Sequence, residues 1–277
     1  MHVISPAAEE MLDKEFRVLD KGFVRLIDYM GNDSRIVAAA RVSYGHGTKS
    51  VREDQGLIDY LVRNQHLTPL EQVILTFHCK MPIFVARQWN RTRTARMNEV
   101  SARYSVLPEE FYIPEPDQVR AQSAKNKQGR DGELPESVVR EFITYTSNVG
   151  IDEFAEYNSF LEDGVARELA RINLPLSTYT EWYWQIDLRN LFNFLDLRLD
   201  GHAQYEIREY AKVLMHCAQA VAPMACASFD EHILHGERFS KTELKEIRNM
   251  ITGNPAIITD DKRMQEFLEK LRNGVEE

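Results

Sequence analysis

The chain has 277 residues, of which 43% are hydrophobic and 28% charged, a balance typical of a soluble globular protein with a sizeable core. Its net charge of -9 argues against general nucleic-acid binding, because nonspecific affinity for phosphate backbones needs a basic surface. No apolar run approaches the roughly 20 residues that span a bilayer, and the amino-terminal segment lacks the pattern of a targeting signal. We therefore expect a cytoplasmic protein without membrane association, in which the widely spaced Cys79, Cys217 and Cys226 are buried thiols.

Two strands are predicted in the amino-terminal half, over residues 22–31 and 73–80. The second strand alternates between apolar and polar residues, so we expect it to be half-buried. Its apolar face comprises Val73, Leu75, Phe77 and Cys79.

Helices are expected between and after these strands. The first covers residues 33–45, with Asp33 or Ser34 as its N-cap. The second covers residues 50–65, which open with the spacing of a capping box and carry an apolar stripe. A third helix is expected over residues 82–98, beginning at a proline that suits the first helical turn.

The carboxy-terminal half is predicted to be mostly helical. A polar stretch with Gly and Pro over residues 117–136 predicts an insertion loop. Residues 177–186 alternate and contain enough aromatic side chains to predict a strand. Helices are expected from residue 135 onward and over residues 165–174, 187–199 and 202–222.

The order of these elements predicts an α+β fold, because strands are interspersed among longer helices without a regular βαβ repeat. We expect a single domain over residues 1–228. A charged appendage with two weaker helical patterns is expected over residues 229–277.

Several patterns that suggest other chemistry fail on spacing. The segment GHGTKS at residues 45–50 does not have the spacing of a phosphate-binding loop, so a surface turn is expected there. Two pairs, His232 with His235 and His202 with Glu206, have the spacing of metal ligands, but each lacks a third ligand nearby, so no metal site is predicted. Ser101 has no activating base close in sequence, so it is not predicted to be a nucleophile.

Residues 87–105 gather arginines around one acid, Glu99, in an otherwise acidic chain. A solvated, charged helix face is the ordinary explanation of such a stretch. The alternative is a site for a compact anion, because guanidinium groups bind phosphate oxygens through paired hydrogen bonds, and Gln88 could bond the polar groups of a base. The arginines are Arg87, Arg91, Arg93, Arg96 and Arg103.

A second polar set follows far downstream. Arg189 and Arg198 fall about half a turn apart around the helix expected over residues 187–199, so this helix could contact two ligands at once. Asn193 accompanies Arg189. Arg171 adds a cation where another helix is expected to end, although cations at such a place are also favoured for purely structural reasons.

At these residues the chain resembles the flavin-dependent thymidylate synthases. The family signature is Arg-His-Arg followed after seven residues by Ser, and it appears here as Arg91-Thr92-Arg93 followed after seven residues by Ser101. Further matches occur in the order of the family, over roughly residues 23–228. They are HxTPxE, PIFVARQW, NExSxRYS, ARxxLPL and FLxLRxDxHAQxEI.

The resemblance implies a fold, a reaction and an assembly. Members convert dUMP to dTMP with 5,10-methylenetetrahydrofolate as carbon donor, NADPH as reductant and FAD as cofactor. Their α+β fold packs a mostly antiparallel sheet against long helices, and they are homotetramers whose sites combine residues of neighbouring subunits. No cysteine nucleophile is required, which agrees with thiols set among apolar residues that would raise their pKa.

The resemblance also implies a role for each matching position, and no metal. Arg198 is the expected catalytic residue, which polarises or ionises the pyrimidine ring. The residues expected to contact dUMP are Gln88, Trp89, Asn90, Arg91, Glu99, Val100, Ser101, Ala102, Arg103, Arg171 and Arg198. The residues expected to contact FAD are Thr68, Arg91, Thr92, Arg93, Glu99, Asp187, Leu188, Arg189 and Asn193, with Ser43 and His66 at the edge of the flavin.

Two positions depart from the family pattern. Thr92 stands where the family usually has His, and Gln72 stands where a second His commonly follows TPxE. Threonine is shorter and cannot stack on or bond the flavin as imidazole does, so we expect weaker FAD retention with the fold kept. Two alternatives follow: a flavoprotein of the same fold with impaired synthase activity, and a nucleotide- or RNA-binding module that uses the same arginines.

Overall fold

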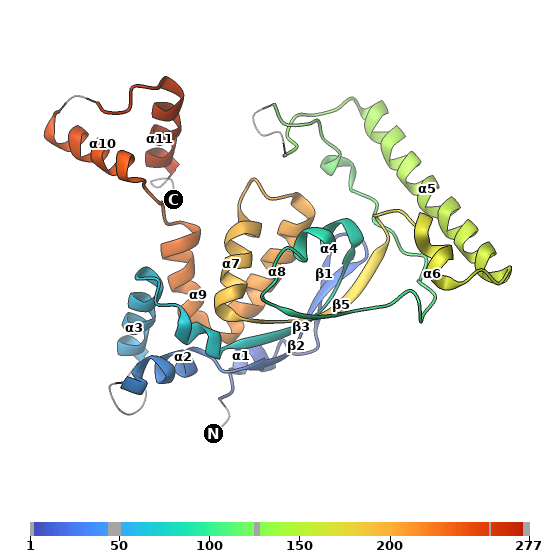
Figure 1. Ribbon diagram of the computed structural model, residues 1–277, viewed down its shortest axis with the longest axis horizontal. Coiled ribbons are helices and arrows are strands. Elements are labelled where there is room, and N and C mark those ends of the chain that lie inside the picture. Colours follow the sequence, from blue (N-terminus) through green and yellow to red (C-terminus); the bar gives the residue numbers. More distant parts are fainter. Residues whose placement is uncertain (1–2, 44–50, 125–127, 255, 274–277) are drawn as a thin grey trace.

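The computed structural model describes residues 3–43, 51–124, 128–254 and 256–273; the predictions for residues 45–50 lie outside this range. Its centre is an antiparallel sheet of five strands in the order β1-β2-β3-β5-β4 (Figure 1). The predicted α+β class and mostly antiparallel sheet are confirmed. The strands are β1 (Glu15–Val18), β2 (Gly22–Met30), β3 (Ile74–Pro82), β4 (Arg96–Glu99) and β5 (Tyr179–Asp187).

One face of the sheet forms the main core. The alternation predicted for β3 is confirmed, because all four residues of its apolar face are fully buried. Three helices cover this face, and Figure 1 shows them on the same side of the sheet. They are α4 (Ile83–Trp89), α7 (Leu188–Leu199) and α8 (Tyr205–Val221).

A group of smaller helices continues the core beyond one edge of the sheet. In this group α3 packs against α2 and α9, and α1 packs against α8. Two 3₁₀ turns lie between the helices and the strands. These elements are α1 (Pro6–Glu9), α2 (Asp33–Ala40), η1 (Arg41–Ser43), α3 (Val51–Arg63), η2 (Thr68–Gln72) and α9 (Pro223–Phe229).

The N-cap of α2 is Asn32, so the prediction of Asp33 or Ser34 is wrong. The Asn32 side chain accepts a hydrogen bond from the Ser34 amide at 3.0 Å. Asp33 caps a different helix instead: its carboxylate accepts from the backbone N–H groups of Met224 and Ala225 at 2.9 and 3.0 Å. A local cap and a distant one have the same residue preferences, so the sequence could not separate them.

The helix predicted over residues 82–98 is also wrong, because α4 ends at Trp89. The Trp89 side chain is fully buried, and the N–H groups of Arg91 and Thr92 bond to the Gln88 and Trp89 carbonyls in a tight turn. Residues 96–99 then pair with β5 as the edge strand β4. Arg87 and Arg91 therefore do not share one helical face.

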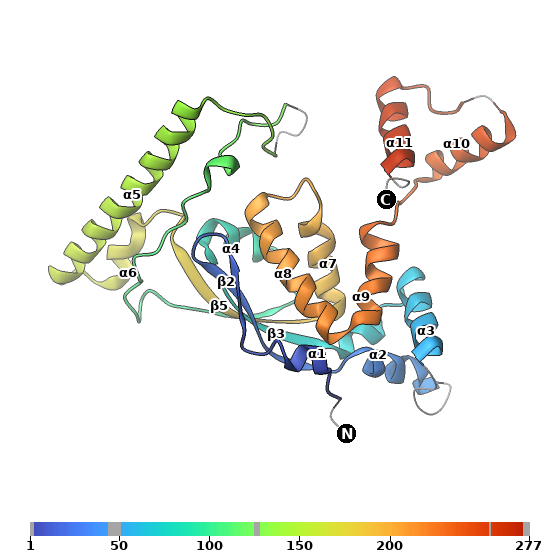
Figure 2. The ribbon, with the colours of Figure 1, turned by 180° about the vertical axis from the view of Figure 1, so that it is seen from behind.

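A long helix, α5 (Glu136–Glu162), stands away from the sheet (Figures 1 and 2). It packs on a second, smaller core that contains Phe111, Phe154 and Tyr157. The helix predicted over residues 165–174 is reduced to α6 (Arg167–Ala170) and a 3₁₀ turn, η4 (Arg171–Asn173). Pro175 explains where η4 ends, because the residue before a proline is pushed out of helical geometry and Leu174 is accordingly not helical.

The carboxy-terminal segment contains the two helices expected beyond Phe229, α10 (Lys241–Thr252) and α11 (Asp261–Asn273), and they lie apart from the sheet (Figure 2). The Ser240 side chain caps α10 in a capping box, and Gly253 at φ +69° ends it. Two further short elements are the 3₁₀ turn η3 (Pro116–Gln118) and the π-helix η5 (Asp230–Leu234). Within the described ranges, no helix has both the length and the apolar character needed to cross a bilayer.

Candidate functional site

The end of α4 meets the last turn of α7 at Arg198. The Arg198 guanidinium donates from Nη2 to the Gln88 carbonyl at 3.3 Å. Its Nε is buried and has no hydrogen-bond partner in the described part of the chain. Partial burial also lowers the pKa of this guanidinium. A half-buried cation with an unused donor suits a ligand that brings an acceptor or a negative charge.

A chain of hydrogen bonds continues from Gln88 into the interior. Its side-chain amide bonds to Gln204, which donates to Glu206 Oε2 at 2.8 Å. Glu206 is 2% exposed, and its other oxygen accepts from Tyr112 at 3.2 Å and from Arg130 at 3.0 Å. Burial, followed by the nearby Glu206 carboxylate, raises the pKa of Tyr112.

None of the four residues that follow Gln88 in this chain of bonds was predicted to belong to the dUMP or FAD site. Gln204 and Glu206 belong to the quoted segment HAQxEI, so the motif letters were a usable signal without an assigned role. Tyr112 and Arg130 carried no such signal, because they lie 94 and 76 residues away from Glu206.

A second group of predicted residues surrounds the beginning of α7. Arg189 forms an ion pair with Glu71 of η2. Asn193 lies one turn along the same helix and is exposed, and Thr68 at the start of η2 is exposed as well. Asp187 caps α7, because its carboxylate accepts from the Asn190 amide at 3.0 Å.

The arginine turn between α4 and β4 connects the first group to the edge of the sheet. Arg91 and Arg93 are exposed on this turn, with Thr92 half-buried between them. At its far end Arg96 donates to the Gln185 side chain at 3.3 Å.

A third group lies at the end of β4. The Glu99 carboxylate accepts from the Thr180 hydroxyl at 2.7 Å, and Arg103 forms an ion pair with Glu168 at 3.0 Å. A cavity of about 660 Å³ opens beside Arg103. Arg171 lies half-buried on η4, directly after α6.

The predicted site arginines lie on different elements. Arg198 belongs to α7, Arg103 follows β4 and Arg171 belongs to η4, directly after α6, which stands apart from α7 in Figures 1 and 2. Some predicted positions also cannot offer a side chain to a ligand, because Trp89, Leu188 and Ala102 are buried. They can contribute only backbone groups.

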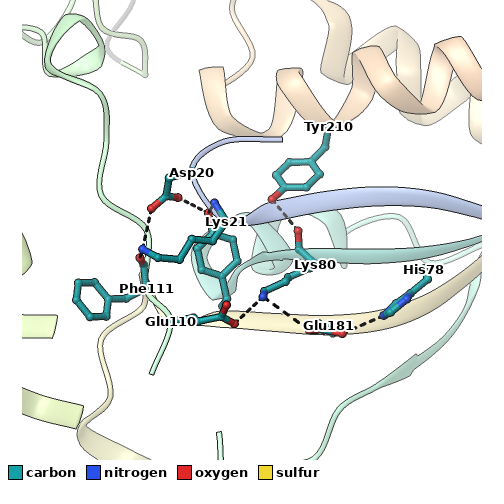
Figure 3. A network of polar contacts seen from close by, with 9 residues as sticks. Asp20, Lys21, His78, Lys80, Glu110, Phe111, Glu181 and Tyr210 are labelled. Atoms are coloured by element: carbon teal, nitrogen blue, oxygen red, sulfur yellow. Dashed lines mark hydrogen bonds and ion pairs between the residues drawn. The ribbon is translucent and has the colours of Figure 1, made fainter. Parts of the chain in front are cut away.

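A polar network holds the segment that follows Arg103 on the sheet face opposite α7 and α8 (Figure 3). Lys80 of β3 forms ion pairs with Glu110 of this segment and, at 4.0 Å, with Glu181 of β5. His78 Nε2 lies 3.0 Å from the second Glu181 oxygen. The segment that carries Glu110 is thereby fixed to the central strands.

The three cysteines are buried, as predicted. Burial raises the pKa of Cys217 to about 12 and raises that of Cys79 and Cys226 as well. Such thiols are poor nucleophiles at neutral pH.

Comparison with known proteins decides the family. The family model "Thymidylate synthase complementing protein" matches residues 25–224. A flavin-dependent thymidylate synthase of Treponema denticola is 58% identical over 264 residues, which cover 95% of this chain and 99% of that protein. The chain belongs to the flavin-dependent thymidylate synthases. The predicted family is confirmed, and with it the predicted class of enzyme, a methyltransferase.

Other flavin-dependent thymidylate synthases extend the similarity. One from Treponema pallidum is 51% identical, with 100% of this chain and 90% of that protein covered. A second family model, "Thymidylate synthase ThyX C-terminal domain", matches residues 237–276. The crystal structure of the UMP/dUMP methylase PolB from Streptomyces cacaoi, bound with 5-Br dUMP, superimposes with a TM-score of 0.72 at 30% identity. It covers 79% of this chain and 99% of PolB.

Proposed function

We propose that the protein converts dUMP to dTMP, with 5,10-methylenetetrahydrofolate as carbon donor, NADPH as reductant and FAD as cofactor. The observation that carries this proposal is the half-buried Arg198, whose enclosed Nε has no partner in the described chain. The similarity to PolB, whose structure holds a halogenated dUMP, supports a pyrimidine nucleotide as the substrate.

Arg198 is the proposed catalytic residue. The C5 atom of uracil is a poor nucleophile, so the reaction requires negative charge to develop on the pyrimidine ring. A guanidinium already held in a partly desolvated position stabilises that charge without reorganising. The bond from Arg198 to the Gln88 carbonyl orients the cation, and the Gln204 side chain fixes Gln88 in turn.

The phosphate and sugar of dUMP are assigned to the remaining predicted contacts. Guanidinium groups suit phosphate oxygens because they offer paired donors in a plane. Within one chain Arg103 forms an ion pair with Glu168. Both side chains are more than half exposed, so the pair is weak and a ligand phosphate can replace Glu168. The proposed residues are Gln88, Trp89, Asn90, Arg91, Glu99, Val100, Ser101, Ala102, Arg103 and Arg171.

The residues around the start of α7 fit a flavin dinucleotide. The Thr68 hydroxyl, the Asn193 amide and the Arg189 guanidinium are donors of the kind that phosphate and ribityl oxygens accept from. The buried Leu188 contributes only its backbone. When bound, the flavin supplies the hydride that reduces the transferred carbon. The remaining FAD contacts are assigned to Arg91, Thr92, Arg93, Glu99 and Asp187.

The protein is further proposed to be a homotetramer with shared sites. The separation of Arg198 from Arg103 and Arg171 supports this assembly, since a neighbouring chain can supply the missing group. The long helix α5 also exposes apolar side chains, which is typical of a surface covered by another subunit. They are Val138, Phe142, Tyr145, Ile151 and Phe160.

A tritium-release assay tests the proposed function. Purified protein is expected to show the visible spectrum of a bound flavin, which NADPH bleaches. With the folate present, it should release tritium from dUMP labelled at C5 and form dTMP. A bleached flavin without tritium release would instead identify a protein that oxidises NADPH and makes no dTMP.

That second outcome is the alternative function, and the observation that favours it is Thr92. The residue lies half-buried in the arginine turn, where the family usually has His. We expect the Thr92→His variant to bind FAD more tightly, because imidazole can stack on or bond the flavin. Flavin titration measures this affinity; an unchanged value would remove Thr92 as a cause of weak retention.

A further inference from the structure

A polar cleft of about 670 Å³ adjoins the Gln88 end of the candidate site. One wall is formed by residues within the segments 118–123 and 128–131, and the other is the turn between α7 and α8 with the start of α8. Gln204, whose side chain bonds to Gln88, lines this cleft. The volume lies within the range of ligand sites. None of the residues predicted to contact dUMP or FAD lines it.

Arginines make the cleft cationic. Arg120 uses its Nε to bond the Asp117 carbonyl at 2.8 Å, and Arg208 uses Nη1 to bond the Gly201 carbonyl at 2.9 Å. In the described chain neither guanidinium forms an ion pair. The Asp200 carboxylate, whose pKa is lowered by hydrogen bonds from His202, also interacts electrostatically with Arg208. The bonds to the two carbonyls orient each guanidinium and leave its other N–H donors for a ligand.

The other charged groups of the cleft are already engaged. Arg130 pairs with the buried Glu206 at 3.0 Å, and its guanidinium lies 5.4 Å from the centroid of the Tyr205 ring. The carboxylate of Asp131 accepts from the Ser123 hydroxyl at 2.6 Å. The serine hydroxyl does not neutralise Asp131, so the lining side chains keep a net positive charge because Arg120 and Arg208 outweigh this one carboxylate.

The amino-terminal end of α8 adds to this character. Its N-cap, Gln204, makes no side-chain bond to the N–H groups of the first turn, and the one acid of that turn, Glu206, is paired with Arg130. The α8 helix has 17 residues, and the positive end of a helix of this length favours a nearby anion.

We propose that the cleft binds the γ-glutamyl tail of the folate co-substrate. This inference rests on the proposed function, because it assigns a place to one of the proposed substrates. Each added glutamyl residue brings one more carboxylate at a regular spacing along the tail. Guanidinium groups on separate elements match such a series better than they match a single phosphate, which needs donors converging on one point. The Gln88–Gln204 contact places this tail subsite directly beside the pyrimidine site.

Steady-state kinetics with two folates test the assignment. We expect the KM for the tetraglutamyl form of 5,10-methylenetetrahydrofolate to be about tenfold lower than that for the monoglutamyl form, which corresponds to one or two charge-assisted bonds. In the double variant Arg120→Gln/Arg208→Gln the ratio of the two KM values should fall towards one. Arg140→Gln, an exposed arginine of α5, is the matched control and should keep the wild-type ratio. Equal KM values in the wild type, or a ratio unaffected by the double variant, would overturn the proposal.

Calorimetry with tetra-γ-glutamate alone separates this inference from the proposed function, because it requires no turnover. The peptide should bind the wild-type holoenzyme and the control, and lose binding in the double variant. Binding of inorganic phosphate in its place, or a KM change confined to NADPH, would contradict the assignment and indicate a phosphate subsite. Absence of dTMP formation with both folates would refute the proposed function, while the peptide titration would still decide the role of the cleft.

Discussion

Arg189 and Arg198 belong to the same helix but contact different elements. Arg189 pairs with Glu71 of η2 near the start of α7, whereas Arg198 bonds to Gln88 of α4 at its end. In the sequence the two arginines fall about half a turn apart around the helix axis. This spacing predicts that they contact different elements. In the proposed function, the same helix contacts the flavin through Arg189 and the pyrimidine through Arg198.

We expect substitutions of these two arginines to have separable effects. Arg198→Gln should reduce tritium release by roughly 100- to 1000-fold, the usual cost of removing one charge-stabilising donor, and should leave flavin binding intact. Arg189→Gln should weaken FAD binding first. Paired tritium-release and flavin-titration measurements check both; loss of flavin from the Arg198 variant would contradict the division.

Asp33 is a buried carboxyl group whose ionisation lowers the stability of the folded protein. It is 8% exposed, and burial raises its pKa to about 6 despite the hydrogen bonds from Met224 and Ala225 that lower it. In the unfolded chain the Asp33 carboxyl group has a pKa of about 4, so the folded state holds this proton more tightly. Stability from this group is complete below about pH 4 and is lost as the pH rises to about 6.

The Asp33→Asn variant should reveal this pH dependence. Relative to the variant, the wild type should lose on the order of 2–3 kcal/mol of unfolding free energy between about pH 4 and pH 6. Denaturant unfolding of both proteins across this range measures the difference. A difference that stays constant with pH would show that Asp33 titrates normally in the folded protein.

Some elements were predictable because their signal is local. The strand β3 is an example, since its apolar residues alternate within nine positions and the alternation alone decides which face is buried. The end of α4 was not predictable, because it depends on where Trp89 packs. Its partners, Trp182, Phe194 and Tyr210, come from three later elements. No period in residues 82–98 encodes that contact.

The packing of α5 against the small core requires a glycine at position 150. A Cβ added at Gly150 would lie 2.4–2.5 Å from ring atoms of Phe111, which is itself buried in the small core. Gly150→Ala should therefore destabilise the protein by about 1–3 kcal/mol, the usual cost of overpacking. Gly56→Ala in α3 is the control. It meets nothing within 4 Å and should be neutral or stabilising by about 0.5–1 kcal/mol. Thermal melts compare the two, and equal melting temperatures would refute the packing argument.

At the scale of the whole molecule, the residues proposed for dUMP fall on separate parts of the chain. Arg198 lies with α4 and α7, whereas Arg103 and Arg171 lie with the end of β4 and with η4. Sequence motifs identified all three arginines but could not show this separation, which depends on how α5 and α6 stand away from the sheet. The bond from Arg130 to Glu206 likewise could not be predicted from the sequence, because the two residues are 76 positions apart.

Mixed oligomers test whether neighbouring chains complete the site. Arg171→Gln and Arg198→Gln should each be inactive alone. After co-expression, a site formed by the intact Arg198 of one chain and the intact Arg171 of another should recover up to about a quarter of wild-type activity, since half of random pairs are mixed and each holds one intact site. Mixtures as inactive as the parents would place the whole site in one chain.

The aromatic cluster around Trp89 has an optical consequence. The chain contains only three tryptophans, and the ring of Trp89 lies 5.4 Å from that of Trp182 and 5.2 Å from that of Trp184. All of the indole fluorescence therefore originates beside Gln88. Because flavins absorb in the range where tryptophan emits, quenching of this emission would report cofactor occupancy in real time, without any attached dye.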